Sequence, residues 1–493
     1  MSTAAREVRT FPGDPPVGLR AVPEPGPPGE VRLRVAPGDL RRTLRLLRAS
    51  GARFVTMTLG REPARSIIVV LAHRGSLVLL RAPDEDCRAL DGTLGAEWPA
   101  AAWAERELRE RHGAAPRGRL LTAPDPDAID RRVHGLDAFV IPYGPVRSGI
   151  FEAIQFQVET GGESVVALQT RPFFKHRGLE ERFRGVPVAD AVHIAERVAG
   201  ISSVAYACAY SQAVERALGI EVSRLAERWR AVHAELERIA CHLDVIAKQA
   251  DTAALSVGHA RFQILKERVM RLRAQLTGSR FGRGAVVPGG VRGIPAHDRN
   301  ALRREIDELE RDLRRDRRLF LATASMTDRL IGTGRLGRDL IDDHGAVGPL
   351  ARGSGVATDA RHERPYGDYR RLGLRVMTRR EGDAMARVNV RFDEIEESLR
   401  LLRQALEHLE PLGEEPASPS PGASGTACGW VEAPQGELLV WVEIADGALA
   451  NVHLASPSLR NWALFDHAFG ADVLTDFAFI EHSFGLTPAG ADR

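Results

Sequence analysis

The sequence predicts an α+β protein, in which a small N-terminal α/β domain precedes a mainly helical domain with small antiparallel sheets. Short apolar runs of strand type alternate with helical patterns between residues 30 and 115. Long patterns of helical period then occupy most of the chain between residues 188 and 409. The strand-like runs that flank these helices lie close together in the chain, as expected for small antiparallel sheets.

The first part of the chain divides into a tail and a small domain. Residues 1–29 are rich in proline, glycine and charge, which predicts a flexible tail. Residues 30–120 form the predicted α/β domain, and residues 121–137, with their prolines and aspartates, form the predicted linker. We expect strands at 31–37, 54–59, 66–72 and 76–82, and helices at 39–51 and 103–113, each closed by a glycine.

Residues 138–493 form the second predicted domain. A small antiparallel sheet is expected near its start, and a hairpin-like stretch follows the Pro/Ser/Gly-rich loop 414–425. The sheet strands are expected at 139–146, 153–160 and 164–171, the hairpin at 429–454, and the helices at 188–218, 223–250, 258–278, 296–330 and 383–409.

The overall charge of the chain is close to neutral, which favours no protein class that binds highly charged surfaces. The chain has 493 residues, with 68 Lys+Arg against 66 Asp+Glu, and a formal net charge of +2. This balance gives no reason to expect binding to nucleic acid or to a membrane surface. A hydrophobic fraction of 44% with 27% charged residues is ordinary for a soluble globular protein.

The cysteines exclude several local designs. Cys87, Cys208, Cys241 and Cys428 form no CxxC pair, so a local zinc ribbon or ferredoxin-type cluster motif is excluded. They also provide no disulfide framework, which fits a reducing compartment. No apolar stretch approaches the roughly 20 residues that span a bilayer, and the N-terminus has no secretory signal pattern. We expect a cytoplasmic protein without direct membrane insertion.

Two local patterns favour structural roles. Residues 332–337 (GTGRLG) satisfy GxGxxG, but a dinucleotide fingerprint needs a preceding strand, and the residues before this segment have a helical pattern. A turn that ends a helix is the better interpretation. His242 lies in the apolar context IACHLDVIA, which favours a core histidine over a metal ligand.

Seven segments, in this order, carry a family resemblance. They are HRGLEERFRG (176–185), ERVAGISSVAYACAYSQAVERALGIEV (196–222), ERWRAVHAELERIACHLDVIA (227–247), GSRFGRGAVVPGGVRGIP (278–295), GAVGPLARGSG (345–355), WVEAPQGELLVWV (430–442) and SPSLRNWALFDHAFGADVLTDFAFIEHSFG (456–485). Together they resemble the large subunit of membrane-bound energy-converting nickel–iron hydrogenases, including the formate hydrogenlyase large subunit. They equally resemble the homologous quinone-site subunit of respiratory complex I. The N-terminal unit, ending WAERELRERHG (103–113), is similar to the small complex I subunit that such hydrogenases carry fused to the large one.

The resemblance implies that the nickel–iron site has been lost. Hydrogenases of this family hold the metals with two CxxC motifs, because soft thiolates suit nickel and iron. The corresponding positions here are Ala199, Ser202, Thr487 and Gly490. Alanine and glycine offer no donor atom, and neutral hydroxyl groups do not replace thiolates. Cys208, six residues beyond Ser202, is better interpreted as helix packing.

Other family positions are retained. His176 and Arg177 match the HRG motif, whose arginine in relatives faces the iron–sulfur cluster of the small subunit. Such a guanidinium stabilises the reduced cluster and raises its potential; the alternative is an arginine that only packs the interface. Glu196, Arg197 and Arg292 are candidates for the former active-site cavity, where they serve proton movement or ligand binding, or form a structural ion pair.

Positions of the complex I quinone site are changed as well. The resemblance places Arg147 and Phe151 where histidines of the first hairpin fall, and Gly200 at the position of a quinone-binding tyrosine. Gly282 replaces the histidine of a G-x-R-x-H segment beside the partner's cluster. A quinone therefore has to bind through other groups.

These features lead to two hypotheses. The first is a large subunit of a hydrogenase-related, complex I-like oxidoreductase complex that has no metal of its own, packs against an iron–sulfur small subunit and passes electrons to a quinone. The second is a non-redox scaffold or coupling subunit of an ion-translocating membrane complex. Both predict antiporter-like membrane-arm partners, no nucleic acid, and a peripheral position on the cytoplasmic face of the membrane. An active hydrogenase is not expected.

Overall fold

We analysed a computed structural model of the chain. It describes residues 7–8, 11–61, 64–86, 93–111, 138–147, 152–292, 299–410, 416–420, 422–470 and 472–493. The predicted linker 121–137, Cys87 and Phe151 lie outside these residues.

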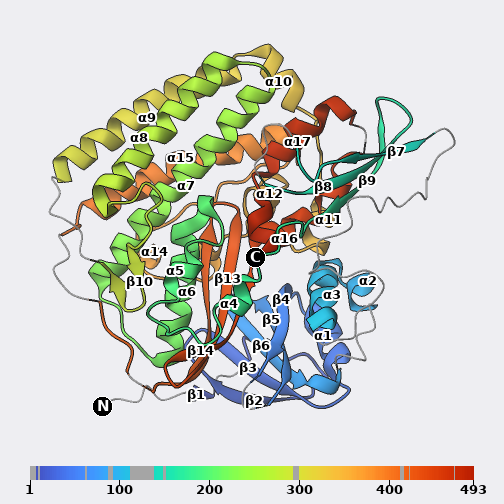
Figure 1. Cartoon of the computed structure of the whole chain (residues 1–493), viewed down its shortest axis with the longest axis vertical. Helices are drawn as coiled ribbons and strands as arrows, with labels where there is room; N and C mark the ends of the chain where they lie inside the picture. The colour runs from blue at the N-terminus through green and yellow to red at the C-terminus, as the bar shows by residue number, and fades with distance from the viewer. Residues whose placement is uncertain are drawn as a thin grey trace.

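The N-terminal part folds into a six-stranded mixed sheet in the order β1-β2-β3-β6-β5-β4 (Figure 1). Its strands are β1 (Glu7–Val8), β2 (Ala21–Gly26), β3 (Glu30–Val35), β4 (Arg53–Gly60), β5 (Ser66–His73) and β6 (Ser76–Pro83). Strands β3 and β6 pair in parallel, and the other neighbours are antiparallel. One face is covered by α1 (Leu40–Ala49), α2 (Thr93–Glu97) and α3 (Ala102–Arg111).

Strand β5, which lies between β6 and β4, is apolar on both sides because both faces of the sheet are covered there. Ile67, Val69 and Leu71 pack with the helices, whereas Ile68 and Val70 pack against a second sheet. The strands expected from sequence are therefore found in place. Strand β2 differs from expectation, because residues 21–26 lie in the predicted tail and yet pair with β3.

The second sheet consists of β12 (Gly425–Ala433), β13 (Gly436–Ala445) and β14 (Ala448–Ala455), all antiparallel. One face, including Cys428, Trp430 and Trp441, packs on the N-terminal sheet. The other face packs on helix α6 (Ser203–Leu218), which approaches so closely that a Cβ at Gly429 would lie 1.9 Å from the carbonyl oxygen of Ala209. The hairpin predicted at 429–454 is thus a three-stranded meander.

Long helices form the remaining part of the molecule (Figure 1). They are α7 (Arg224–Thr252), α8 (Ser256–Thr277), α9 (Arg299–Leu321) and α15 (Ala384–Leu406). Ser223 starts α7 by accepting a hydrogen bond from the N–H of Ala226, and Gly278 ends α8 in the left-handed conformation. The predicted helix 296–330 is two helices, because the chain turns extended at Thr323 before α10 (Ala324–Leu330).

Two further predictions concern the helical part. The predicted helix 188–218 is interrupted, since α5 (Val192–Ala195) ends before Glu196 and α6 begins only at Ser203. The 332–337 segment is a turn after α10, with positive φ at Gly332 and Gly334, as expected for a segment that ends a helix. A small antiparallel sheet of β7 (Phe139–Tyr143), β8 (Gln155–Thr160) and β9 (Val165–Arg171) also forms as predicted.

Candidate functional site

The interruption between α5 and α6 places the first pair of predicted former metal positions, Ala199 and Ser202, on a loop. Ala199 is extended and 2% exposed, and Ser202 immediately precedes α6. Glu237 on α7 holds the first turn of α6, because its carboxylate accepts the N–H groups of Val204 (2.8 Å) and Ala205 (2.9 Å). A carboxylate at a helix N-terminus is electrostatically favourable, so this contact fixes the residue at which the loop ends and α6 begins.

The second pair lies at the start of α18 (Pro488–Asp492). The preceding helix α17 (Phe477–Phe484) stops at Gly485, which adopts the left-handed conformation, and Pro488 then opens α18. Thr487 is extended and buried, and its N–H donates to Ser458 Oγ at 3.3 Å. Gly490 lies one turn further on in α18.

Arg177 brings these two segments together. Its guanidinium donates to the carbonyl oxygen of Val198 at 2.6 Å and to that of Ala489 at 2.9 Å. A third, longer bond of 3.2 Å reaches the carbonyl of Arg197. The residues predicted to be former metal positions therefore belong to two segments that are joined in space by the arginine of the HRG motif.

The donor atoms at these positions do not fit a nickel–iron centre. Ser202 donates its hydroxyl proton to Gln435 Oε1 at 2.7 Å, and Thr487 donates to the carboxylate of Glu152 at 2.7 Å. Both hydroxyls are thus neutral and occupied, and Ala199 and Gly490 have no donor. Soft, negatively charged sulfur ligands, which these metals require, are missing from all four positions.

A cysteine does lie nearby, but it is one that sequence proximity did not indicate. Gln435, which binds Ser202, also donates to Cys241 Sγ at 3.2 Å. Burial raises the pKa of the Cys241 thiol to about 12, so it is neutral at physiological pH. Cys208 instead packs in the hydrophobic core, as expected from sequence. No sequence motif links Cys241 to Gln435, because they are 194 residues apart.

Glu196 and Arg197 form an ion pair with each other at 2.5 Å. The second carboxylate oxygen of Glu196 accepts the N–H of Gly284 at 2.7 Å, and the residue is only 2% exposed. Arg292 continues from β11 (Gly290–Val291), with its main chain bonded to Ala285 at 2.8 Å and its side chain exposed. The ion-pair alternative therefore describes Glu196 and Arg197, whereas Arg292 does not contribute its guanidinium to this pair.

His176 and the loop that carries it are tied to the same C-terminal segment. The Nδ1 atom of His176 lies 2.5 Å from the carbonyl oxygen of Asp492. The Asp492 carboxylate accepts the N–H groups of Phe173 (2.8 Å) and Lys175 (3.0 Å), and burial raises its pKa. These contacts position the HRG motif directly beside α18.

The positions predicted to correspond to the complex I quinone site differ in the space that is available for a side chain or a ligand. Gly200 is exposed, and a Cβ added to it would meet no atom within 4 Å. Gly282 has a φ of +65°, and a Cβ there would lie 2.8 Å from Val204 Cγ2, so a histidine does not fit. Arg147 is buried in a bidentate ion pair with Glu481, at 2.8 and 2.7 Å, and is not available to a ligand.

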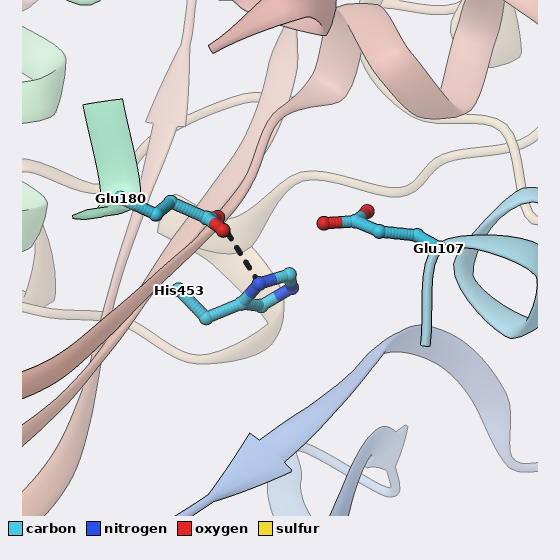
Figure 2. Close-up of side chains that lie close together, drawn as sticks. All are labelled: Glu107, Glu180 and His453. Carbon is cyan, nitrogen blue, oxygen red and sulfur yellow. Dashed lines mark ion pairs between the residues drawn. The ribbon is translucent and has the colours of Figure 1, made fainter. Parts of the chain in front are cut away.

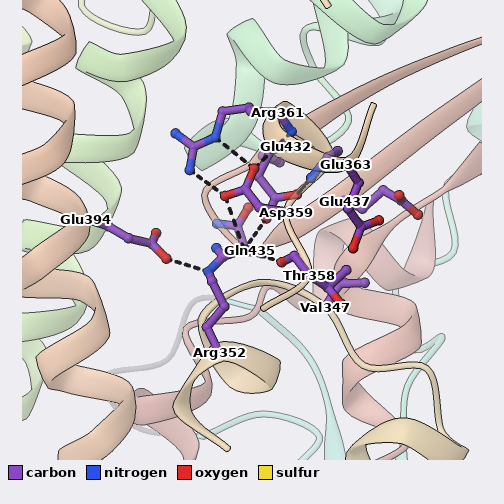
Figure 3. Close-up of polar contacts among 12 residues, drawn as sticks. Val347, Arg352, Thr358, Asp359, Arg361, Glu363, Glu394, Glu432, Gln435 and Glu437 are labelled. Atoms are coloured by element: carbon purple, nitrogen blue, oxygen red, sulfur yellow. Dashed lines mark hydrogen bonds and ion pairs between the residues drawn. The ribbon is translucent and has the colours of Figure 1, made fainter. Parts of the chain in front are cut away.

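Charged side chains form a buried array close to Gln435, the residue that binds Ser202 (Figure 3). Arg352 is at its centre, 2.6 Å from Glu394, 2.8 Å from Glu432 and 3.4 Å from Asp359. The Nε2–H group of His242 donates a hydrogen bond of 2.8 Å to the ionised Glu394 carboxylate, and burial lowers the pKa of His242 to about 4. His242 is therefore a satisfied core histidine, as the sequence indicates, and the array is a buried network of paired charges.

A second buried cluster joins the N-terminal domain to the rest of the molecule (Figure 2). Ligand-type atoms of Glu107 on α3, Glu180 on α4 (Leu179–Arg182) and His453 on β14 lie within 4.8 Å of one another. Arg493 pairs with Glu107 at 2.5 Å and with Glu180 at 3.0 Å, while His453 also contacts Thr56 on β4 at 2.7 Å. Because the guanidinium of Arg493 pairs with both carboxylates, we interpret the cluster as an interdomain contact.

The chain is similar to large subunits of hydrogenases and of complex I. Residues 251–421 match the family described as respiratory-chain NADH dehydrogenase, 49 Kd subunit. Hydrogenase-4 component G of Escherichia coli K12 is 30% identical over 430 residues, which cover 80% of this chain and 74% of the relative. Formate hydrogenlyase subunit 5 of the same organism is 28% identical, over 80% of this chain and 75% of its own length.

A solved structure supports the same assignment. A chain in the membrane-bound sulfane sulfur reductase, an archaeal respiratory membrane complex, superimposes with a TM-score of 0.68 at 27% identity. The match covers 72% of this chain and 99% of that one. The chain therefore belongs to the family of the 49 Kd subunit of respiratory-chain NADH dehydrogenase, and it is homologous to the large subunits of hydrogenase-related and complex I-like membrane complexes. The predicted resemblance to the large subunits of hydrogenases and complex I is confirmed, whereas the similarity of the N-terminal unit to the small complex I subunit stays a prediction.

The helices were also compared with what a membrane span requires. Within the described part of the chain, no helix combines the length and the apolar character needed to cross a bilayer.

Proposed function

We propose that this chain is the large subunit of a membrane-associated oxidoreductase complex that operates without a nickel–iron site of its own. The observation that carries the proposal is the contrast between one retained arginine and four changed metal-ligand positions. Arg177, in the position that faces the partner's cluster, is present and joins both segments. The four former ligand positions hold two hydrogen-bonded hydroxyls and no thiolate.

The partner in this proposal is an iron–sulfur small subunit that packs over the HRG motif on the cytoplasmic face of the membrane. Arg177 is partly exposed at this surface, although it is bonded to three carbonyls. A fixed guanidinium beside a cluster stabilises its reduced, more negative form and so raises its potential. The chain itself then contributes charge and shape, while the partner supplies the electrons.

A quinone is the acceptor that we propose, in the open space beside Gly200. This residue is exposed, has room next to its Cα and is adjacent to the loop bonded by Arg177. Arg197, with half of its side chain exposed, offers guanidinium N–H groups at the same edge. These N–H groups donate to a quinone carbonyl in place of the missing histidine and tyrosine.

The test uses the purified native complex. We expect no stoichiometric nickel by metal analysis and reduction of a short-chain quinone when the complex is supplied with electrons. Gly200→Trp fills the proposed space and should abolish quinone reduction. Gly337→Trp is the matched control, since Gly337 is also exposed with no atom within 4 Å of an added Cβ. Stoichiometric nickel in the wild-type complex would contradict the proposal.

A second candidate is a non-redox scaffold or coupling subunit. It is favoured by the hydrogen bonds from Ser202 to Gln435 and from Thr487 to Glu152, which occupy the hydroxyl groups at two of the four predicted former metal positions. This candidate predicts a complex that assembles and contains the partner's cluster, yet reduces no quinone. Equal quinone reduction by wild type and Gly200→Trp would instead place the quinone elsewhere.

A further inference from the structure

A cavity of about 960 Å³ lies between helices α6 and α7. The end of β2, the start of β12, and helix α14 (Tyr369–Leu372) with the residues before it border the cavity on its other sides. Its apolar lining includes Pro27, Leu218, Ile220 and Val431. Concave sites of this size with largely apolar walls are typical of small-molecule binding, in which a few polar groups orient the ligand.

Small side chains on the two helices leave this space open. Ala205 and Cys208 line the cavity from α6, and Ala231 and Ala234 line it from α7. The two residues of each pair are three positions apart, so they lie on one face of their helix. Protein interiors are close-packed and have few voids larger than a water molecule. A space of this size between two helices therefore indicates room for a ligand.

The buried charged groups in the wall are paired within the protein. Glu215 forms a bidentate ion pair with Arg230, at 3.0 and 2.5 Å. Glu237 accepts two main-chain N–H groups, and Glu432 accepts a bond of 2.8 Å from Arg352. A charged ligand would lose its hydration shell without gaining an unpaired countercharge from these groups, and that loss is costly. The wall therefore favours a neutral ligand.

Two aromatic side chains, Trp430 and Tyr366, also line the cavity. Their polar atoms are engaged within the protein, because Trp430 Nε1 donates to the carbonyl of Arg364 at 3.1 Å and the Tyr366 hydroxyl accepts the N–H of Glu432 at 2.9 Å. What these residues offer to a ligand is ring surface. Aromatic rings pack favourably against other aromatic rings in offset or edge-to-face arrangements. An aromatic ligand therefore matches this part of the wall.

Gln212 supplies a hydrogen-bond donor to the same space. It lies one helical turn beyond Cys208 on α6, lines the cavity and is half-buried. Among the residues that the structure describes, none forms a hydrogen bond with its side-chain amide. The amide NH₂ group can donate to a carbonyl oxygen of a ligand. Burial raises the pKa of the neighbouring Cys208 thiol to about 12, so the thiol is neutral and contributes packing surface.

We propose that this cavity binds a neutral aromatic compound that carries one carbonyl group. The ring system lies between the small side chains of α6 and α7 and packs against Trp430 and Tyr366. The carbonyl oxygen accepts a hydrogen bond from Gln212 Nε2. The described lining does not include Arg177, and this ligand site does not depend on the function proposed above.

Equilibrium dialysis of the purified full chain tests the proposal, with 2-acetylnaphthalene as the probe. 2-Ethylnaphthalene has nearly the same shape without the carbonyl, and 2-naphthoate carries a negative charge. We expect 2-acetylnaphthalene to bind at least about tenfold more tightly than 2-naphthoate. Gln212→Ala should weaken binding of 2-acetylnaphthalene by about fivefold, the value of one hydrogen bond, and leave binding of 2-ethylnaphthalene unchanged.

A second variant fills the cavity. Ala234 is half-buried in the wall, and Ala234→Trp should weaken binding of both neutral naphthalenes by at least about tenfold. The matched controls are Gln275→Ala on α8 and Ala301→Trp on α9, both at exposed positions outside the cavity, and they should leave binding unchanged. If Ala234→Trp does not fold, as judged by circular dichroism, Gln212→Ala decides the outcome.

Three results would overturn the proposal. The first is that 2-acetylnaphthalene does not bind, or binds no better than 2-naphthoate. The second is that Gln212→Ala and Gln275→Ala have the same effect on its binding. The third is that a folded Ala234→Trp variant binds it as the wild type does.

Discussion

Arg177 and Ala489 are 312 residues apart in the chain, and the guanidinium of the first donates to the main-chain carbonyl of the second at 2.9 Å. The same guanidinium holds the carbonyl of Val198 at 2.6 Å. One side chain thus fixes the distance between the loop before α6 and the start of α18. The connection between these two segments is therefore made by the hydrogen bonds of one arginine.

Removal of this arginine should loosen the contact between the two segments. Arg177→Ala loses charge-assisted bonds to three carbonyls, and we expect the free energy of unfolding to fall by about 3 kcal/mol. Arg177→Lys should recover about half of that loss, because one ammonium group cannot reproduce the planar fork. Urea denaturation of the purified chain measures both. Arg224→Ala, at an exposed position in the first turn of α7, should change the value by less than about 0.5 kcal/mol.

The sequence predicted elements well where local patterns determine them. Strands β3 to β6 of the N-terminal sheet and the helices α7, α8 and α15 follow from apolar periodicity, which neighbouring residues carry in full. The contact between Gln435 and Cys241 was missed, since it depends on how a strand turn meets a helix far away in the chain. Strand β2 was missed for a related reason. Its prolines suppress the strand pattern, and pairing with β3 overrides that preference.

Acid should weaken the fold through His242. In the folded state burial lowers the pKa of His242 to about 4 from an ordinary value of 6.5. As the pH falls through this interval, the unfolded chain binds a proton before the folded one does, so stability is lost. The full effect is roughly 3 kcal/mol, present above the upper value and gone below the lower one. The slope of unfolding free energy against pH, measured by urea denaturation, should be shallower in His242→Gln.

His193 provides the comparison for that experiment. Its side chain is 44% exposed, in contrast to the 1% of His242. His193→Gln should leave the slope between the two pH values unchanged. An identical slope in wild type and His242→Gln would show that other groups, such as the buried His233, govern the acid response.

Backbone conformation and close packing leave no room for a side chain at Gly282. Gly282 has a φ of +65°, and an added Cβ would lie 2.8 Å from Val204 Cγ2. Gly282→Ala should therefore lower the free energy of unfolding by about 2 kcal/mol, from the left-handed backbone and the clash together. Gly200→Ala, at an exposed position with no atom within 4 Å of the new Cβ, should change it by less than about 0.5 kcal/mol. Thermal denaturation ranks the two variants.

Two adjacent glutamates on α4 allow the stability contribution of a buried interdomain contact to be compared with that of a surface ion pair. Glu180 binds Arg493 at 3.0 Å, His453 at 3.1 Å and the N–H of Leu454 at 2.8 Å, and its side chain is 5% exposed. Glu181 is 63% exposed, and its pair with Arg61 is 3.6 Å long. Deleting one partner of a buried pair leaves the other charge without compensation, whereas an exposed pair contributes little.

Glu180→Ala should accordingly lower the free energy of unfolding by about 3 kcal/mol, and Glu181→Ala by less than about 1 kcal/mol. Because Arg493 also pairs with Glu107 on α3, the loss at Glu180 should reach the N-terminal domain. Limited proteolysis should then cut Glu180→Ala faster than Glu181→Ala between that domain and the rest of the chain. Equal unfolding energies for the two variants would mean that the domains are held mainly by the apolar contact between their sheets, through residues such as Trp441 and Val70.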